Sequence, residues 1–258
     1  MAYIIAITNQ KGGVGKTTTS VNLAASLVQE NQRILMIDMD PQGNATMGSG
    51  IEKSDLELSA YDSLMEPEEI KSHIVTSSVA GYDVLPSNGD LTAAEVHLLE
   101  FDDKEKRLKK ALERVSDLYD FILIDCPPSL NMLTLNSLVA SNSVIIPMQC
   151  EYYALEGLSA LLNTIGQVQE HVNRDLEIEG ILRTMYDPRN RLSLEVSRQL
   201  FSHFADKVYR TVIPRNVRLA EAPSHGVPVL FYDRSSSGSK AYLALAGEII
   251  KRRGNATA

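Results

Sequence analysis

Residues 11–18 of this 258-residue chain form a glycine-rich segment that reads Lys11-Gly12-Gly13-Val14-Gly15-Lys16-Thr17-Thr18. The segment follows a short apolar stretch typical of a buried strand and leads into a helical pattern that begins near Lys16. Glycines allow successive backbone N–H groups to turn toward one anion, and the N-terminus of the following helix adds partial positive charge. We therefore predict a phosphate-binding loop, in which Lys16 reaches the β- and γ-phosphates of a nucleotide and the Thr17 hydroxyl is a ligand of Mg²⁺.

This loop departs from the usual P-loop pattern at its first position. Gln10 stands where that pattern has a glycine, and a second lysine, Lys11, follows it. A glycine-rich turn that binds no ligand is the alternative. The Gly-Lys-Thr ending between an apolar strand and a helix favours phosphate binding.

Short β-branched runs alternate with longer helical patterns along the rest of the chain. Alternation of this kind predicts an α/β fold with a mostly parallel, twisted sheet and helices on both faces. Together with the glycine-rich loop, it predicts a P-loop NTPase whose Walker A loop deviates from the usual pattern. The expected strands are Tyr3–Thr8, Arg33–Asp38, Tyr82–Pro86, Asp120–Asp125, Ser143–Met148, Glu179–Met185 and Lys207–Ile213. The expected helices are Lys16–Glu30, Lys104–Asp117, Leu130–Ala140, Leu155–Val172, Leu192–Phe204 and Lys240–Arg252.

The composition is that of a core-forming protein, with 44% hydrophobic and 22% charged residues. We expect a single domain over residues 1–258, with residues 43–81 as an excursion of weak periodicity and residues 254–258 disordered. The two cysteines, Cys126 and Cys150, are too few for a disulfide scaffold and suit small buried positions in a reducing compartment. No secretory signal or membrane-spanning run is expected.

Three aspartates end expected strands. Asp38 and Asp40 follow one apolar run and Asp125 ends another. Open α/β sheets bind ligands at the carboxyl ends of their strands, and carboxylates there can hold Mg²⁺ through its water shell. Each aspartate alone could instead cap a helix or start a turn, but three of them beside a phosphate loop favour a metal and nucleotide site.

The charge is distributed unevenly. The chain carries −8 overall, whereas the stretch from Arg183 to Arg218 holds eight basic residues and three acidic ones. A basic face of this kind suits a polyanion, although a solvated face with scattered ion pairs is the alternative. The sequence has no helix-turn-helix or zinc motif, so binding would be to phosphates and indifferent to base sequence.

Several motifs together resemble the ParA/Soj partition ATPases, relatives of MinD. The resemblance covers nearly the whole chain and is closest to the chromosomal type without an additional N-terminal DNA-binding domain. It is carried by the loop Lys11–Thr18 and by the segments Asp38–Asn44, Asp125–Ser129, Gln149–Gly157 and Ile213–Ser224.

This resemblance implies roles for individual residues. Asp40 would position or activate the attacking water, Asp125 would hold the metal through water, and Cys126–Leu133 would form the second switch. Lys11, which has no obvious target in its own site, would reach the phosphates of a partner subunit, and a solvated loop lysine is the alternative. Pro214 and Asn216 would lie against the adenine, with Met185 a weaker candidate, and Arg189 and Arg218 would contact DNA.

The function implied is that of a Mg²⁺-dependent ATPase that forms an ATP-sandwich homodimer and binds double-stranded DNA nonspecifically. A ParB-type centromere-binding protein would be its partner in partitioning a chromosome or plasmid. The protein would be cytoplasmic and nucleoid-associated. A membrane-cycling MinD-like ATPase is one alternative, which the missing amphipathic C-terminal anchor disfavours. A dethiobiotin synthetase-like enzyme is the other, which Lys11 and the basic stretch disfavour.

Overall fold

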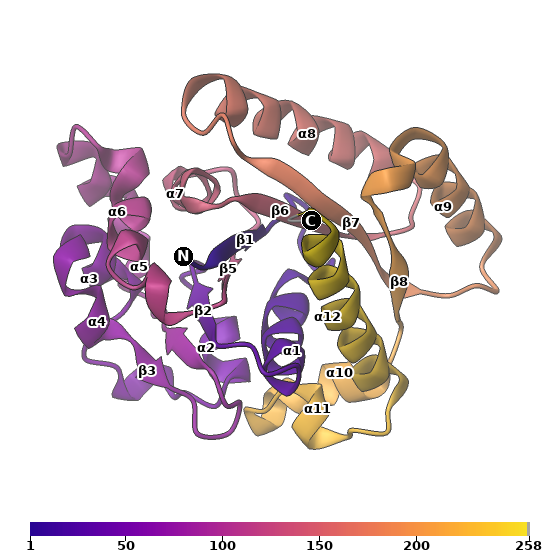
Figure 1. Cartoon of the computed structure of the whole chain (residues 1–258), viewed down its shortest axis with the longest axis horizontal. Helices are drawn as coiled ribbons and strands as arrows, with labels where there is room; N and C mark the ends of the chain where they lie inside the picture. Colours follow the sequence, from indigo (N-terminus) through magenta and orange to yellow (C-terminus); the bar gives the residue numbers. More distant parts are fainter. Residues whose placement is uncertain (257–258) are drawn as a thin grey trace.

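The computed structural model describes residues 1–256, which contain one eight-stranded sheet in the order β3-β4-β2-β5-β1-β6-β7-β8 (Figure 1). Every neighbouring pair is parallel except β3 with β4. The mostly parallel sheet predicted from the sequence is therefore confirmed. The strands are β1 Tyr3–Ile7, β2 Ile34–Asp38, β3 Val75–Thr76, β4 Asp83–Leu85, β5 Phe121–Asp125, β6 Ser143–Gln149, β7 Glu177–Tyr186 and β8 Val208–Pro214.

The central strands are buried on both faces because their sequences are continuously apolar. In β5, Phe121 and Leu123 pack into one core, whereas Ile122 and Ile124 pack into the other. Successive side chains of a strand point to opposite faces, so an apolar run supplies both cores at once.

Helices cover both faces of the sheet, as predicted. The core on one face receives apolar side chains from α1, α2, α10, α11 and α12, and the other receives them from α3 to α9. Figure 1 shows α1 and α12 side by side on the first of these faces. The helices are α1 Lys16–Gln29, α2 Asn44–Gly48, α3 Ala60–Met65, α4 Ile70–His73, α5 Leu91–His97, α6 Arg107–Glu113, α7 Met132–Ala140, α8 Ala154–His171, α9 Arg191–Phe204, α10 Val217–Glu221, α11 Val229–Tyr232 and α12 Ser237–Ala256.

Several parts of the chain differ from the sequence expectations, and helices α5, α10 and α11 were not among the expected elements. Residues 43–81 form the short helices α2, α3 and α4 and the two-residue strand β3. The last helix is longer than expected and continues to Ala256, so residues 254–256 are helical rather than disordered. Residues 257–258, also expected to be disordered, lie outside the described residues.

The sheet brings the carboxyl ends of β1, β2 and β5 to one edge. Ile7 of β1 and Asp38 of β2 are both in register with Asp125 of β5. The glycine-rich segment leaves β1 at this edge, so the aspartates and the loop meet there, as expected for an open α/β sheet.

Candidate functional site

The glycine-rich segment is an open loop between β1 and α1. Gly13 and Gly15 have φ angles of +73° and +90°, which side chains other than glycine rarely adopt. A Cβ atom added to Gly12 or Gly13 would meet no atom within 4 Å. The loop therefore leaves room beside its backbone at the N-terminus of α1, where an anion is favoured.

Lys16 begins α1 and is only 7% exposed. Burial lowers the pKa of its ammonium group, and the charges of Asp125, Cys126 and Asp40 oppose this shift. The fold thus holds a cation out of water beside the open loop. An anion bound there would compensate the desolvation of the ammonium.

Thr17 and Asp125, the two residues expected at the metal ion, lie together in the structure. The Thr17 hydroxyl donates to Oδ2 of Asp125 over 2.8 Å. Ser20, which sequence reasoning missed, donates to Oδ1 of the same carboxylate over 2.8 Å. Its signal in the sequence was its place one turn after Thr17 on α1, since residues three apart lie on the same helix face.

The buried residues Asp125 and Asp38 lie side by side, in register on the neighbouring strands β5 and β2. Burial raises the pKa of Asp125, and the charge of Asp38 raises it further. Burial likewise raises the pKa of Asp38, although hydrogen bonds from Thr46 and from the backbone of Asp40 oppose the shift. Two buried carboxylates on neighbouring strands repel one another, so a bound cation would stabilise their charged forms.

Asp40 lies two residues beyond β2 and is partly exposed. Its Oδ1 accepts a hydrogen bond from the backbone N–H of Gln42 over 3.0 Å. The carboxylate is therefore turned toward its own loop, close enough to Lys16 to affect the pKa of the ammonium.

Lys11 has a partner in its own chain, which the sequence did not reveal. Its Nζ lies 2.6 Å from Oε2 of Glu151, and both side chains are about half exposed, at 48% and 50%. Glu151 follows β6 and precedes α8, beside the exposed Tyr152. Sequence reasoning saw no target for Lys11 because this contact joins residues 140 positions apart.

A cavity of about 330 Å³ adjoins the glycine loop. Pro214, Asn216 and Met185 line it together with Gly15 and Thr18, so the structure brings the expected adenine-contacting residues next to the loop. Met185 has a φ of +47°, uncommon for a residue other than glycine, and strain of this kind concentrates at functional sites.

Thr184 lines this cavity and also forms a hydrogen bond to the glycine loop. It was not expected as a site residue, yet its hydroxyl donates to the backbone oxygen of Val14 over 2.7 Å. Because Thr184 precedes Met185 in β7, one strand fixes the loop and lines the cavity.

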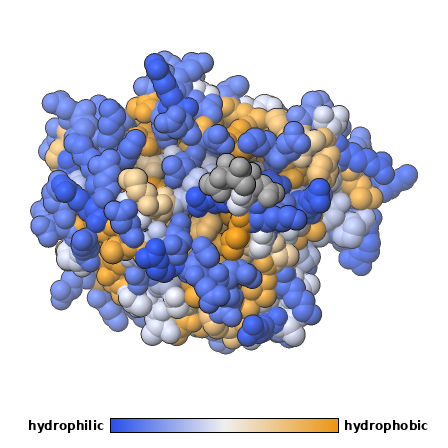
Figure 2. Space-filling view, viewed as in Figure 1, coloured by the Kyte–Doolittle hydropathy of each residue, from blue (hydrophilic) through white to orange (hydrophobic). Residues whose placement is uncertain are grey.

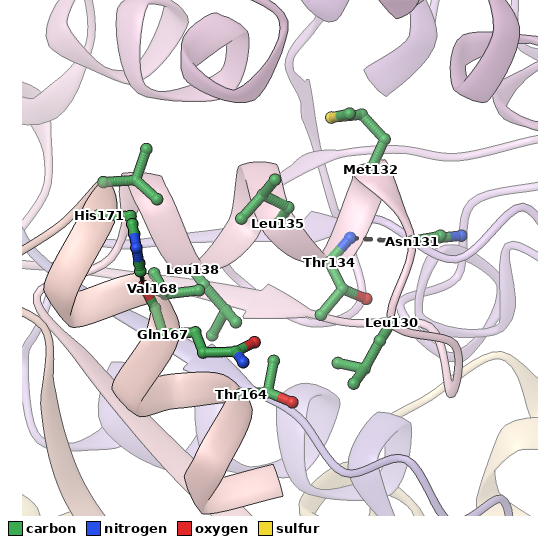
Figure 3. Close-up of a pocket in the computed structure, with 11 residues that line it drawn as sticks. Leu130, Asn131, Met132, Thr134, Leu135, Leu138, Thr164, Gln167, Val168 and His171 are labelled. Atoms are coloured by element: carbon green, nitrogen blue, oxygen red, sulfur yellow. Dashed lines mark hydrogen bonds between the residues drawn. The ribbon is translucent and has the colours of Figure 1, made fainter.

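A larger cavity, of about 500 Å³, lies between α7 and α8 (Figure 3). Its lining is mainly apolar, with Leu135, Leu138 and Val168 directed toward the space in Figure 3. Its lining contains one histidine, His171, and no acidic side chain, lysine or arginine. Size alone does not identify the site, because the groups suited to phosphates and a metal lie at the glycine loop, which the smaller cavity adjoins.

The basic stretch is not one continuous exposed patch. Arg183 is buried at 6% exposure and donates to Ser197 Oγ and to the backbone oxygen of Tyr209, so it belongs to the interior. Arg189 and Arg218 are exposed, as DNA contact would require. Both form ion pairs in this chain, Arg189 with Asp187 at 2.9 Å and Arg218 with Glu221 at 2.6 Å.

The face shown in Figure 2 is mostly hydrophilic, with apolar residues among the polar ones. Within residues 1–256, no helix has the length and apolar character needed to cross a membrane. The same residues hold no cluster of three or more histidine, cysteine, aspartate or glutamate side chains arranged for a metal ion.

Comparison with known proteins gives a consistent family. Residues 2–178 match the family described as AAA domain, AAA_31. The sporulation initiation inhibitor protein Soj of Bacillus subtilis is 57% identical over 249 residues, covering 96% of this chain and 98% of that protein. The chromosome-partitioning ATPase Soj of Treponema pallidum is 49% identical over 254 residues, covering 98% of this chain and 99% of that protein.

A solved structure supports the fold at similar coverage. It is described as cobyrinic acid a,c-diamide synthase from Mycobacterium smegmatis with bound ATP analog and magnesium. It is 35% identical, has a TM-score of 0.84, and is matched over 98% of this chain and 96% of its own. The deviant glycine loop, the aspartates at the sheet edge and the nearly full-length matches agree: this chain belongs to the ParA/Soj family of partition ATPases.

Proposed function

We propose that this protein is a Mg²⁺-dependent ATPase whose whole chain acts as one domain and forms an ATP-sandwich homodimer. The dimer binds double-stranded DNA nonspecifically, and a ParB-type centromere-binding protein stimulates hydrolysis during chromosome or plasmid partitioning. The observation that carries the proposal is the convergence of Lys16, Thr17 and Asp125 at the open loop beside the cavity lined by Pro214 and Asn216. The relatives named partition ATPases support the biological role.

The residues present fit ATP and Mg²⁺. The loop has open space at Gly12 and Gly13, and a buried lysine begins the helix next to it. Hydroxyl and carboxylate oxygens from Thr17 and Asp125 are the hard ligands that Mg²⁺ prefers. When bound, the metal ion would neutralise charge on the phosphates, with Thr17 as a ligand and Asp125 holding it through water.

The chain's own groups would then orient and stabilise the reacting phosphate. Lys16 binds the β- and γ-phosphates, and backbone N–H groups of residues 11–18 cradle them. Asp40 orients the attacking water from the loop after β2. Its present contact with the Gln42 N–H is a single hydrogen bond at a partly exposed position, so the carboxylate can exchange it for water.

Lys11 would act on the phosphates of the partner subunit. Its ion pair with Glu151 is about half exposed, and pairs of this kind contribute only about 0–1 kcal/mol. A phosphate group can therefore compete for Lys11 when two subunits meet. A cation supplied by the partner stabilises charge that develops on the transferred phosphoryl group.

Arg189 and Arg218 would contact DNA phosphates. Their ion pairs are exposed and screened by salt, so a polyanion can displace the acidic partners. Dimer formation doubles the number of basic residues on one particle, and affinity for DNA rises steeply with each phosphate neutralised. Nucleotide-dependent dimerisation would thus control residence on the nucleoid.

A DNA gel shift with ATP, with ADP and without nucleotide tests the proposal. We expect a shift with ATP only, and none for the Lys16→Ala variant under any condition. Sedimentation of the same samples reports the dimer separately. A dimer with ATP that shifts no DNA would contradict the DNA-binding part, and a shift independent of nucleotide would contradict the switch.

A further inference from the structure

The backbone of Asp40 is held from both sides by buried polar groups. Its N–H donates to Oδ1 of Asp38 over 3.1 Å. Its carbonyl oxygen accepts from the hydroxyl of Ser87 over 2.8 Å and from the N–H of Gly43 over 2.9 Å. Hydrogen bonds to the backbone of Asp40 therefore hold the loop in place at the residue that carries the proposed catalytic carboxylate.

Thr46 connects the two sides of this arrangement. Its N–H and its hydroxyl both donate to Oδ2 of Asp38 over 2.8 Å. Its hydroxyl oxygen also accepts from the N–H of Ser87 over 2.9 Å. Asp38, Thr46 and Ser87 are each 0% exposed, so water cannot replace these bonds.

The turn after Asp40 also rests directly on Ser87. Gly43 has a φ of +62°, and a Cβ atom there would lie 2.7 Å from the backbone oxygen of Ser87. Lys53 covers the same turn and donates from Nζ to the backbone oxygen of Gln42 over 2.7 Å. A shift of residue 87 or residue 46 would therefore move the turn that contains Asp40.

The carboxylate of Asp40 is outside the network. It accepts from Gln42 within the turn, whereas Asp38 and Ser87 form hydrogen bonds to its backbone only. Thr46 reaches that backbone only through Asp38 and Ser87. This division fixes the position of the residue and leaves its side chain able to rotate. Residues 43–88 thus contribute to the position of Asp40, since α2 contains Thr46 and the segment after β4 contains Ser87.

We propose that Thr46 is a positioning residue for Asp40, with Ser87 as the second contact that holds the Asp40 backbone. The inference rests on the proposed function, because it assumes that Asp40 orients the attacking water. Loss of the Thr46 hydroxyl would leave the Ser87 N–H without its acceptor and would leave Asp38 Oδ2 with only the Thr46 N–H as a donor, so the turn would lose its fixed position. Hydrolysis would slow, whereas ATP binding at residues 11–18 would not change.

The test compares steady-state ATP hydrolysis and nucleotide affinity in single variants. Thr46→Val keeps the shape of the side chain and removes the hydroxyl, and we expect kcat to fall by about tenfold or more, because small misplacements of a reacting group are costly. Nucleotide affinity should stay within about threefold. Thr46→Ser retains the hydroxyl and should restore most of the rate.

A matched control separates positioning from a general loss of a buried hydroxyl. Ser77 lies in the same part of the chain and donates to the backbone oxygen of Ser49 over 2.6 Å, away from the Asp40 turn. Ser77→Ala should lower the melting temperature and leave kcat unchanged. If Thr46→Val does not fold, Ser87→Ala serves in its place, because the Ser87 N–H still reaches Thr46 and only the bond to Asp40 is lost.

A double variant shows whether Thr46 acts through Asp40. In the Asp40→Ala background, the second change Thr46→Val should lower kcat no further, since the residue it positions is gone. A full additional fall, a wild-type rate for Thr46→Val, or a loss of ATP affinity equal to the loss of rate would each overturn the inference. If Asp40→Ala itself hydrolyses ATP normally, the proposed role of Asp40 fails instead.

Discussion

At the scale of single residues, Lys16 carries a positive charge although only 7% of its surface is exposed to solvent. Such burial is costly unless an anion compensates the charge. Lys16→Ala should therefore lose ATP affinity by about tenfold or more, since a hydrogen bond to a charged group contributes about 1.5–3 kcal/mol. DNA binding should disappear with it.

Titration with a fluorescent ATP analogue and a DNA gel shift measure the two effects. Lys11→Ala is the matched control, because Lys11 is an exposed lysine of the same loop. It should retain ATP and lose hydrolysis or productive dimer formation. ATP affinity of Lys16→Ala within a few-fold of wild type would remove Lys16 from the phosphate site.

Asp40 allows a complementary prediction about turnover. Asp40→Ala leaves Lys16, Thr17 and Asp125 intact, so ATP should still bind and the dimer should still form. Hydrolysis should fall by about a hundredfold or more, because the attacking water loses its orienting group. Gel filtration after ATP addition should show that the dimer accumulates, and a variant that remains monomeric would exclude this role.

At the scale of elements, Glu248 of α12 forms hydrogen bonds to the edge strand β8. Its carboxylate accepts from the N–H groups of Arg210 and Thr211, each over 2.9 Å, and pairs with Arg252. Burial alone would raise the pKa of Glu248, but these donors outweigh it and the pKa is lowered. A carboxyl whose pKa is lowered on folding stabilises the fold above its unfolded pKa of about 4.3, and this contribution is lost as pH falls through the lower folded value.

Glu248→Gln should accordingly reduce the free energy of unfolding by about 1–3 kcal/mol at pH 7. The difference from wild type should shrink when urea unfolding is repeated near pH 3. Glu170→Gln, at an exposed position of α8, is the control and should have little effect at either pH. A Glu248→Gln deficit that does not change with pH would show that side-chain packing, rather than the ionised carboxylate, fastens α12.

Sequence reasoning succeeded where the signal is local and continuous. The apolar runs of β5 and β6 predicted buried parallel strands, and the glycine loop predicted the start of α1 at Lys16. It missed β3, because Val75 and Thr76 form a two-residue, exposed strand without a pattern of its own.

The remaining omissions concern contacts between residues far apart in the chain. The ion pair of Lys11 with Glu151 spans 140 positions, and the bond between Thr46 and Ser87 spans 41. Arg183 was counted with the basic stretch, but its place in β7 beside α9 and β8 buries it. No local pattern reports such partners, because the folded sheet alone brings them together.

At the scale of the whole molecule, DNA binding should depend on the exposed arginines and not on the nucleotide site. Changing Arg189 and Arg218 to Glu replaces two positive charges by two negative ones in each subunit, and therefore four by four in a dimer. Binding that is dominated by phosphate contacts should not survive this reversal at moderate salt. ATP-dependent dimerisation should be retained, because both residues lie outside the glycine loop.

Arg174→Glu, which changes an exposed arginine outside the basic stretch, is the control, and this variant should shift DNA almost as wild type does. Wild-type affinity should fall steeply as salt rises and differ little among DNA sequences, since each neutralised phosphate adds about 0.9 to the salt slope. The prediction is contradicted if the double variant dimerises with ATP and still shifts DNA like wild type. Arg189 and Arg218 would then form only surface ion pairs, with Asp187 and Glu221. The DNA-binding face would lie elsewhere, and Lys240 and Lys251 would be the next residues to test.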